Sequence, residues 1–180
     1  MSTPDLPVPP DLPDPPDLPD PPDLPGLLQR ARQAGVMIAT AESCTGGMVA
    51  AALTEIPGSS DVVERGFVTY SNRAKREMLG VRADTLDAHG AVSEAVAHEM
   101  AAGARDRAGV ALAVAATGIA GPGGSAHKPE GRVCFGLAAA GHPVMTETVE
   151  FGARGRAAVR AAARDHALAL LARGLSHFGA

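Results

Sequence analysis

The chain has 180 residues, of which 46% are hydrophobic but only 3% aromatic, and its formal net charge is −4. This length suggests one domain, and the shortage of aromatic residues predicts a core of Ala, Val, Leu and Met between closely spaced elements. The sequence has no basic patch with aromatic stacking groups, no 18-residue apolar run and no secretion leader. We therefore expect a cytoplasmic protein that binds neither nucleic acid nor membrane.

Residues 1–25 consist mainly of Pro, Asp and Leu, with a repeated hexad DLPxPP and no Lys or Arg. Pro removes backbone donors and favours extended conformations, and one Leu per hexad cannot build a core. These features predict a disordered acidic tail at residues 1–25 and a folded domain at residues 26–180. The tail either solubilises the protein or docks on a proline-recognising partner, and the sequence specifies no such partner.

Helical and strand patterns alternate through the folded part. The predicted helices cover residues 26–34, 46–55, 72–79, 93–107 and 154–173. The predicted strands cover residues 36–40, 64–71, 110–117, 132–140 and 143–151, the last two forming a hairpin. This order predicts a layered α/β domain with a mostly parallel sheet and an antiparallel edge.

The segment ESCTGG directly follows the first predicted strand, and ligands in such sheets bind beyond the carboxyl ends of strands. Ser43 or Thr45 can simply cap the next helix. Alternatively, the amides of Thr45, Gly46 and Gly47 can hold an anion or an oxyanion close to an attacking hydroxyl. The residues alone leave both interpretations open.

The segment YSNRAK follows the second predicted strand. If Ser71 or Asn72 caps the next helix, Lys75 lies in its first turn, where the helix dipole and burial both lower a lysine pKa. Lys75 is then either a base or an ordinary surface lysine. Tyr70, the only tyrosine, is in the simplest interpretation an interior aromatic residue with a hydrogen-bonded hydroxyl.

Two further segments suggest contacts with an anion. The glycine-rich segment 117–124 lets backbone amides approach a phosphate, although such loops are common. Arg154, Arg156 and Arg160 gather at the start of the last helix and are either solvated or close over a phosphate or carboxylate. Cys44 and Cys134 lack metal-ligand spacing, so we expect no metal.

Four segments in order, TAESCTGG, GSSxxxxRGFVTYSNxAK, GAVSEAVAxEMA and ATGIAGPGG, resemble the CinA C-terminal domain family over about residues 26–175. The resemblance implies a three-layer α/β/α sandwich with a mostly parallel sheet and an antiparallel edge hairpin, assembled as a homodimer. It also implies an amidohydrolase that converts nicotinamide mononucleotide to nicotinate mononucleotide and ammonia in NAD recycling, without a cofactor.

Matching the motifs residue by residue, Ser43 and Lys75 resemble a serine–lysine catalytic dyad, with Tyr70 orienting Lys75 or the substrate. The expected substrate-binding residues are Glu42, Thr45, Gly46, Gly47, Asn72, Thr117, Gly118, Gly121 and Arg156. The segment KPEG departs from the usual KPVG at Glu130. Two alternatives remain, a nucleotide-binding module without catalysis and an interaction protein linked to competence or DNA damage.

Overall fold

The structure, a computed structural model, describes residues 23–125 and 127–179. The predicted disordered tail lies mostly outside these residues, and its last two residues belong to the first helix. Asp23 caps this helix by accepting a hydrogen bond from the Gly26 amide at 3.0 Å, and Pro25 fits the first turn because that turn needs no amide donor there. The first helix therefore begins two residues earlier than the sequence predicts.

The described residues form six α-helices and five strands. The helices are α1 (Leu24–Ala34), α2 (Met48–Thr54), α3 (Asn72–Leu79), α4 (Ala83–His89), α5 (Glu94–Ala108) and α6 (Arg156–Leu175). The strands are β1 (Ile38–Glu42), β2 (Val63–Val68), β3 (Leu112–Gly118), β4 (Arg132–Ala139) and β5 (Met145–Glu150). Short 3-10 helices cover Ser59–Asp61 and Ser176–Phe178.

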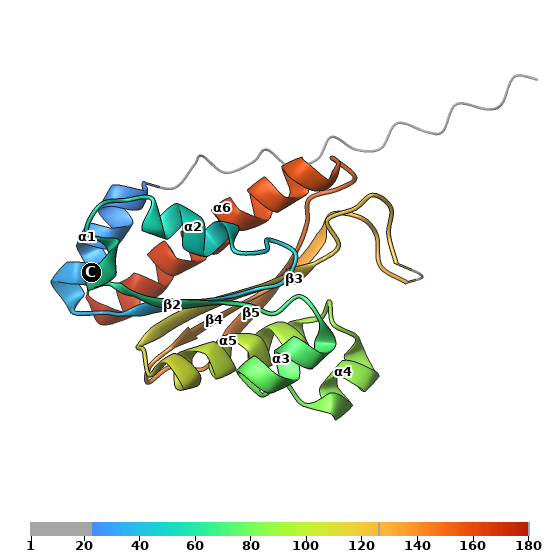
Figure 1. Ribbon diagram of the computed structural model, residues 1–180, viewed down its shortest axis with the longest axis horizontal. Coiled ribbons are helices and arrows are strands. Elements are labelled where there is room, and N and C mark those ends of the chain that lie inside the picture. The colour runs from blue at the N-terminus through green and yellow to red at the C-terminus, as the bar shows by residue number, and fades with distance from the viewer. Residues whose placement is uncertain (1–22, 126, 180) are drawn as a thin grey trace, which may run out of the picture.

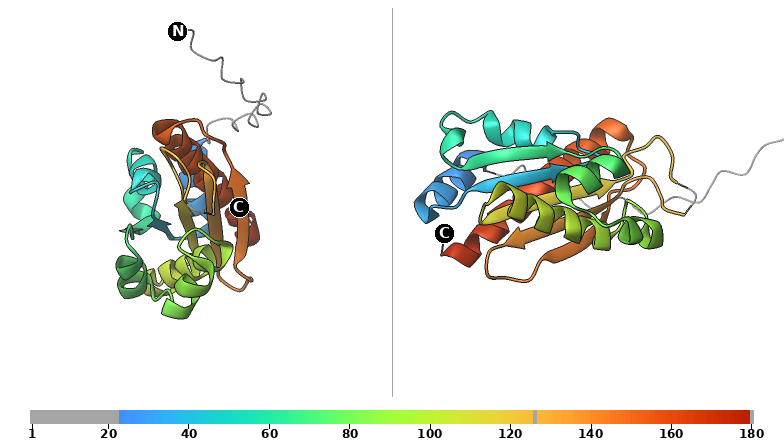
Figure 2. Two further views of the ribbon diagram at one scale, coloured as in Figure 1. Left: turned by 90° about the vertical axis from the view of Figure 1, so that its right-hand side faces the viewer. Right: turned by 60° about the horizontal axis from the view of Figure 1, so that its bottom comes forward.

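One sheet with the strand order β2-β1-β3-β4-β5 lies between two layers of helices (Figures 1 and 2). Strand β1 pairs in parallel with β2 and β3, whereas β4 is antiparallel to both β3 and β5. Helices α1, α2 and α6 cover one face, and α3, α4 and α5 cover the other (Figure 1). The predicted three-layer sandwich with an antiparallel edge hairpin is confirmed.

Alternate residues of the central strands supply two separate cores. Ile38, Leu112 and Val114 pack under α1, α2 and α6, while the alanines between them face α5. A Cβ at Gly136 of β4 would lie 2.4 Å from the carbonyl oxygen of Ala97 in α5, so this helix lies directly on the sheet backbone. Small side chains on both sides permit this approach, as the low aromatic content predicted.

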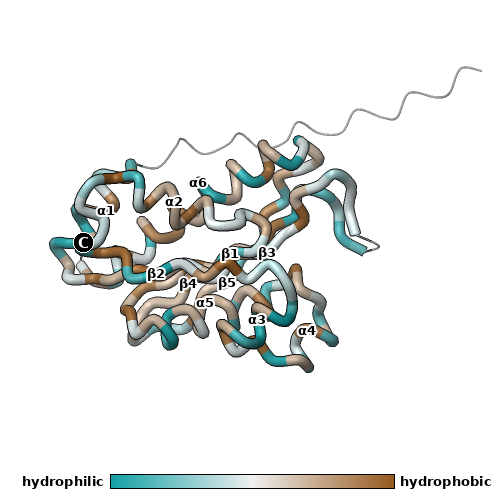
Figure 3. Tube along the Cα trace, in the orientation of Figure 1, coloured by the Kyte–Doolittle hydropathy of each residue, from teal (hydrophilic) through white to brown (hydrophobic). Residues whose placement is uncertain are grey.

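The sequence did not predict α4, which has seven residues and no side-chain cap. Only Thr85 and Leu86 of α4 are buried, so it offers too little periodicity to recognise. By contrast, α6 shows hydrophobic and hydrophilic segments alternating along its length (Figure 3). None of the helices within the described residues is long and apolar enough to cross a membrane.

Candidate active site

The carboxyl ends of the three parallel strands meet at one edge of the sheet. Glu42, the last residue of β1, pairs with Val68 of β2 and with Ala116 of β3. The amide of Ser43 then donates to the Ala116 carbonyl at 2.9 Å, which holds the residue after β1 against β3. The segments ESCTGG, YSNRAK and TGIAGPGG therefore lie side by side.

The Ser43 hydroxyl and the Lys75 amine are in direct contact. The Lys75 Nζ lies 3.0 Å from the Ser43 Oγ and donates to the Thr69 carbonyl at 2.7 Å. Lys75 is 1% exposed, so it is not a surface lysine. A neutral amine can keep the bond to Thr69 and use its lone pair to accept the hydroxyl proton of Ser43.

Burial lowers the pKa of Lys75 from 10.5 to about 8. Lys75 also lies in the first turns of α3, because the Ser71 side chain caps this helix by accepting from the Ala74 amide at 3.0 Å. The positive end of the helix dipole opposes a charge on the amine in this position. A fraction of the Lys75 amines is therefore unprotonated near neutral pH and able to accept a proton.

Cys44 lies directly beside Ser43, and the sequence interpretation gave its side chain no role. Burial raises the pKa of the Cys44 thiol from 9.0 to about 11. The thiol is therefore protonated at neutral pH, and a protonated thiol is a poor nucleophile. Of the two adjacent groups, the hydroxyl of Ser43 is the one in contact with a base.

Glu42, expected to bind substrate, is 1% exposed and lies beneath the start of α2. Its carboxylate accepts hydrogen bonds from the amides of Gly47, Val49 and Ala50 at 2.9, 3.1 and 2.9 Å. The sequence suggested a cap from Ser43 or Thr45, but the carboxylate satisfies the free amides of this helix instead. We therefore assign Glu42 to the support of the turn.

The expected anion site at the amides of residues 45–47 is partly occupied by the protein. The Gly47 amide donates to Glu42, and the Gly46 amide donates to the Ser43 carbonyl at 3.1 Å. The two glycines have φ values of 61° and 96°, which favour residues without a Cβ. Their role in the described structure is to shape the turn.

A cavity of about 220 Å³ opens beside the Ser43–Lys75 pair. Its lining residues are Ser43, Cys44, Tyr70, Lys75, Ala91, Val92, Thr117, Gly118, Ala120 and Arg156. The Thr117 hydroxyl donates to the Ala91 carbonyl at 2.8 Å, which holds the segment between α4 and α5 at the cavity wall. The apolar wall residues Ala91, Val92 and Ala120 lie within two of the motifs that resemble the family, but the sequence analysis gave them no role in the site.

Tyr70 and Arg156 form one side of the cavity rim. Arg156 donates to the Tyr70 hydroxyl at 2.9 Å and to the Gly121 carbonyl at 3.0 Å. Tyr70 is 62% exposed, so the interior interpretation of this residue is wrong. Glu130 also holds this rim in place. Its carboxylate accepts hydrogen bonds from the amides of Gly123 at 2.6 Å and Gly155 at 3.2 Å.

The structure separates the remaining expected residues from the cavity. Asn72 begins α3 and is exposed, whereas Thr45 is fully buried, and the cavity lining within the described residues includes neither. Gly121 is also outside the cavity lining in the described part of the chain, and its carbonyl accepts a hydrogen bond from Arg156. Arg160, which the sequence grouped with Arg156, reaches the carbonyls of Cys44 and Thr45.

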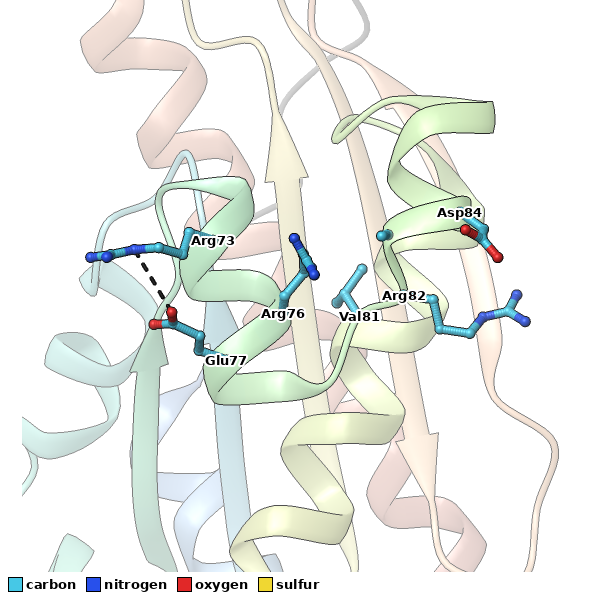
Figure 4. Close-up of a pocket in the computed structure, with 7 residues that line it drawn as sticks. Arg73, Arg76, Glu77, Val81, Arg82 and Asp84 are labelled. Carbon is cyan, nitrogen blue, oxygen red and sulfur yellow. Dashed lines mark ion pairs between the residues drawn. The ribbon is translucent and has the colours of Figure 1, made fainter.

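A larger cleft of about 680 Å³ lies between α3 and α4 (Figure 4). Arg73 and Arg82 extend from it in opposite directions (Figure 4). Arg73 lies 3.9 Å from Glu77, and Arg82 pairs with Glu99 at 2.9 Å. Because Arg73 and Arg82 point apart and each has a carboxylate beside it, we assign no site there.

Comparison with known proteins agrees with this fold. The sequence profile of the CinA C-terminal domain family matches residues 26–175. A crystal structure of the competence/damage inducible protein CihA from Agrobacterium tumefaciens is 49% identical and superposes with a TM-score of 0.79. That alignment covers 87% of this chain and 97% of the other.

Two curated relatives differ in length. A CinA-like protein of Chlorobium phaeobacteroides is 58% identical over 67% of this chain, but this chain spans only 30% of its length. A protein of Enterobacter agglomerans named nicotinamide-nucleotide amidohydrolase PncC is 55% identical over 65% of this chain and 72% of its own length.

Proposed function

Because the chain belongs to the CinA C-terminal domain family, we propose that it hydrolyses the carboxamide of nicotinamide mononucleotide to nicotinate mononucleotide and ammonia. The observation that carries this proposal is the 3.0 Å contact between the Ser43 Oγ and a buried amine of lowered pKa. The relative named nicotinamide-nucleotide amidohydrolase supports the choice of substrate. In the cell, this reaction would return nicotinamide nucleotides to NAD synthesis.

The first half of the proposed reaction acylates Ser43. Neutral Lys75 accepts the hydroxyl proton while the Ser43 Oγ attacks the carboxamide carbon. The tetrahedral intermediate then breaks its C–N bond, and the ammonium group of Lys75 returns the proton to the leaving ammonia. The Thr69 carbonyl holds the Lys75 Nζ throughout, so that the amine stays directed at Ser43.

The second half releases the acid. A water molecule enters the place that ammonia has left and gives a proton to Lys75 as its oxygen attacks the acyl carbon. The C–O bond to Ser43 then breaks, and the Ser43 Oγ recovers its proton from Lys75. Nicotinate mononucleotide leaves, and both side chains return to their starting protonation states.

For substrate binding, we propose that the nicotinamide ring occupies the cavity between Thr117 and the apolar wall at Ala91 and Val92. The phosphate would then lie at the rim, where Arg156 is exposed and already oriented by Tyr70 and Gly121. A guanidinium binds phosphate through two parallel hydrogen bonds. Tyr70 thus orients Arg156 and the substrate, since its hydroxyl bonds Arg156.

Ammonia release from nicotinamide mononucleotide tests the proposal. The wild-type protein is expected to release ammonia, and Ser43→Ala is expected to bind the nucleotide without releasing it. Ser60→Ala, which alters an exposed serine, is the matched control. A Ser43→Ala protein that turns over at the wild-type rate rejects the mechanism, and a wild-type protein that binds without turnover supports a binding module instead.

The pH dependence follows from the lowered pKa of Lys75. Only the unprotonated amine can accept the Ser43 proton, so kcat/KM is expected to rise with pH and level off above about pH 8. Well below that pH, each unit should change the rate about tenfold. Rates between pH 6 and 9.5 for the nucleotide and for nicotinamide riboside, which has no titrating phosphate, would measure this. A flat profile contradicts the role of Lys75.

Arg156→Met is expected to raise KM for the mononucleotide by about 10- to 100-fold with a smaller change in kcat, since a charge-assisted contact contributes about 1.5–3 kcal/mol. Nicotinamide riboside lacks the phosphate, so its KM should change far less. Steady-state kinetics on both substrates would separate the two effects. Equal changes for both substrates would show that Arg156 does not contact the phosphate.

We also propose the homodimer that the family resemblance implies. Strand β2 is one of the two outer strands of the sheet, and Val68 at its end and Tyr70 two residues further along the chain are 47% and 62% exposed. Apolar groups along a free strand edge are typical of surfaces that a partner covers.

The free thiols of Cys44 and Cys134 agree with the proposed location in the reducing cytoplasm.

A further inference from the structure

Lys128 connects the glycine-rich loop after β3 to the chain between α4 and α5, which we call the wall segment (residues 89–92). The Lys128 Nζ donates to the carbonyls of His89 at 2.9 Å and of Val92 at 2.5 Å. The loop that carries Lys128 is itself anchored, because the amide of Gly131 donates to the Ile119 carbonyl at 2.8 Å. Lys128 therefore joins the wall segment to a loop that is fixed at its base.

Side chains hold every carbonyl of the wall segment. Lys128 bonds the first and the last of the four, and the hydroxyls of Ser93 and Thr117 donate to the two between them at 2.9 and 2.8 Å. The bonds from Lys128 are charge-assisted, and such bonds are stronger than those between neutral groups. Lys128 is thus the one side chain that ties both ends of the segment.

The wall segment lies between two hollow spaces. Ala91 and Val92 line the 220 Å³ cavity beside Ser43, and they also line a second cavity of about 460 Å³ that includes Lys128. Ala91 packs partly against the core under α5, whereas Val92 belongs to neither core within the described residues. Because a side chain next to empty space lacks packing contacts there, the position of Val92 depends on hydrogen bonds to its backbone.

We propose that Lys128 is a positioning residue for the substrate, which fixes Ala91 and Val92 where they form the subsite for the nicotinamide ring. This inference rests on the proposed function and names the residue that shapes its ring subsite. Lys128 is not among the described residues that line the cavity beside Ser43, so it acts through the wall segment.

The expected kinetic effect follows from this indirect role. Without the ammonium, the wall segment would leave its place in a fraction of the molecules, and substrate would have to order it on binding. Apparent affinity falls in proportion to the fraction in which a site is already formed. The complex that results is the same as in the wild-type protein, so KM should rise while kcat stays nearly constant.

The test compares Lys128→Met and Lys128→Arg with the wild-type protein on nicotinamide mononucleotide. Loss of a charge-assisted hydrogen bond shifts an equilibrium by about 10- to 100-fold. Because Ser93 and Thr117 still hold the middle of the segment, we expect Lys128→Met to raise KM by about 10-fold, at the lower end of this range, with kcat within about threefold. A guanidinium can donate to both carbonyls, so Lys128→Arg should keep KM within about threefold of the wild-type value.

His127→Ala is the matched control. His127 is an exposed neighbour on the same loop and lines the second cavity, but among the described residues it makes no hydrogen bond to the wall segment. Its loss should leave both KM and kcat at their wild-type values.

Nicotinamide riboside separates the role of Lys128 from that of Arg156. Both substrates carry the ring, so Lys128→Met should raise the two KM values by the same factor, whereas Arg156→Met should act mainly on the mononucleotide. An unchanged KM in Lys128→Met would overturn the inference. A change confined to the mononucleotide would overturn it too, since Lys128 would then act on the phosphate.

Methyl NMR of Val92 gives a second measurement that needs no turnover. We expect the order parameters of the Val92 methyl groups to fall in Lys128→Met and to keep their wild-type values in Lys128→Arg and His127→Ala. Unchanged order in Lys128→Met would reject the positioning role. If the wild-type protein releases no ammonia from the mononucleotide, the proposed function fails, and the methyl result still decides whether Lys128 holds the wall segment.

Thermal melting of each variant shows whether it is folded at the assay temperature. If Lys128→Met does not fold, Lys128→Gln replaces it in both measurements, because its shorter, uncharged side chain cannot span both carbonyls. A raised KM for both substrates and a lower methyl order in Lys128→Gln support the inference, and wild-type values reject it.

Discussion

Lys75→Met is expected to lower turnover of the amide by at least about 10³-fold while making the protein more stable below pH 8. The loss of rate follows because, among the described residues, Lys75 is the proton acceptor within hydrogen-bonding distance of the Ser43 hydroxyl. The gain in stability follows because a buried ammonium is costly, and Met fills the same volume without a charge. A residue kept only for folding would show the opposite change in stability.

The pH dependence of this stability gain has a definite sign. The folded-state pKa of Lys75 is about 8, whereas the unfolded chain keeps the ordinary 10.5. Between these values the unfolded state binds more protons, so wild-type stability rises with pH. The advantage of Lys75→Met is therefore complete below pH 8, at about 3 kcal/mol as an upper estimate, and fades toward pH 10.5.

Urea unfolding of both proteins at pH 6, 8 and 10 would measure this effect. Ser43→Ala is the matched control, because it removes the activity without removing the buried amine. A stability difference that is absent at pH 6, or that grows with pH, would contradict the assignment of a lowered pKa to Lys75.

Glu42→Ala is expected to lower the free energy of unfolding by about 3–5 kcal/mol and to abolish measurable turnover. The carboxylate receives three amides at the start of α2 and the Thr40 hydroxyl at 3.2 Å. Without it these donors are left without a partner, because alanine cannot reach them. The turn that carries Ser43 is then no longer held against α2.

Glu42→Gln keeps the shape of the side chain but places an NH2 group against the amide donors at the start of α2. This variant should therefore lose part of the free energy of unfolding that Glu42→Ala loses. Glu55→Ala is the control, because it removes an exposed glutamate at the other end of α2. Urea unfolding at pH 7 would rank the three variants. A loss below about 1 kcal/mol for Glu42→Ala would show that water replaces the carboxylate.

The two residues proposed for catalysis were recognisable in the sequence, and the reason is local. Ser43 follows a buried strand, and Lys75 lies in the first turns of a helix that Ser71 caps, so short-range patterns and the family resemblance were enough to single them out. The layered fold was predictable on the same basis, since strand and helix periodicities are carried by neighbouring residues.

The hydrogen-bond partners of Glu42 and Arg160 were not predictable in this way. An acidic residue beside a strand end is an expected ligand of a substrate, and nothing in its neighbours shows that α2 folds back over its carboxylate. Arg156 and Arg160 lie close together in the sequence, and nothing local distinguishes them. In the structure, however, Arg160 donates to the Cys44 carbonyl beside Ser43, whereas Arg156 donates to the Tyr70 hydroxyl at the cavity rim. Which partner each arginine meets depends on how α6 crosses the sheet.

The amino-acid sequence by itself determined the order of the strands and of five of the six helices in the described residues, the serine and the lysine, and the small side chains that let α5 lie on the sheet. Only the tertiary structure decided that the Lys75 amine meets the Ser43 hydroxyl at 3.0 Å and that this amine is buried enough for its pKa to fall. The reason is physical. Propensity and periodicity act between neighbours in the chain, whereas desolvation and hydrogen-bond direction depend on groups that only the folded sheet brings together.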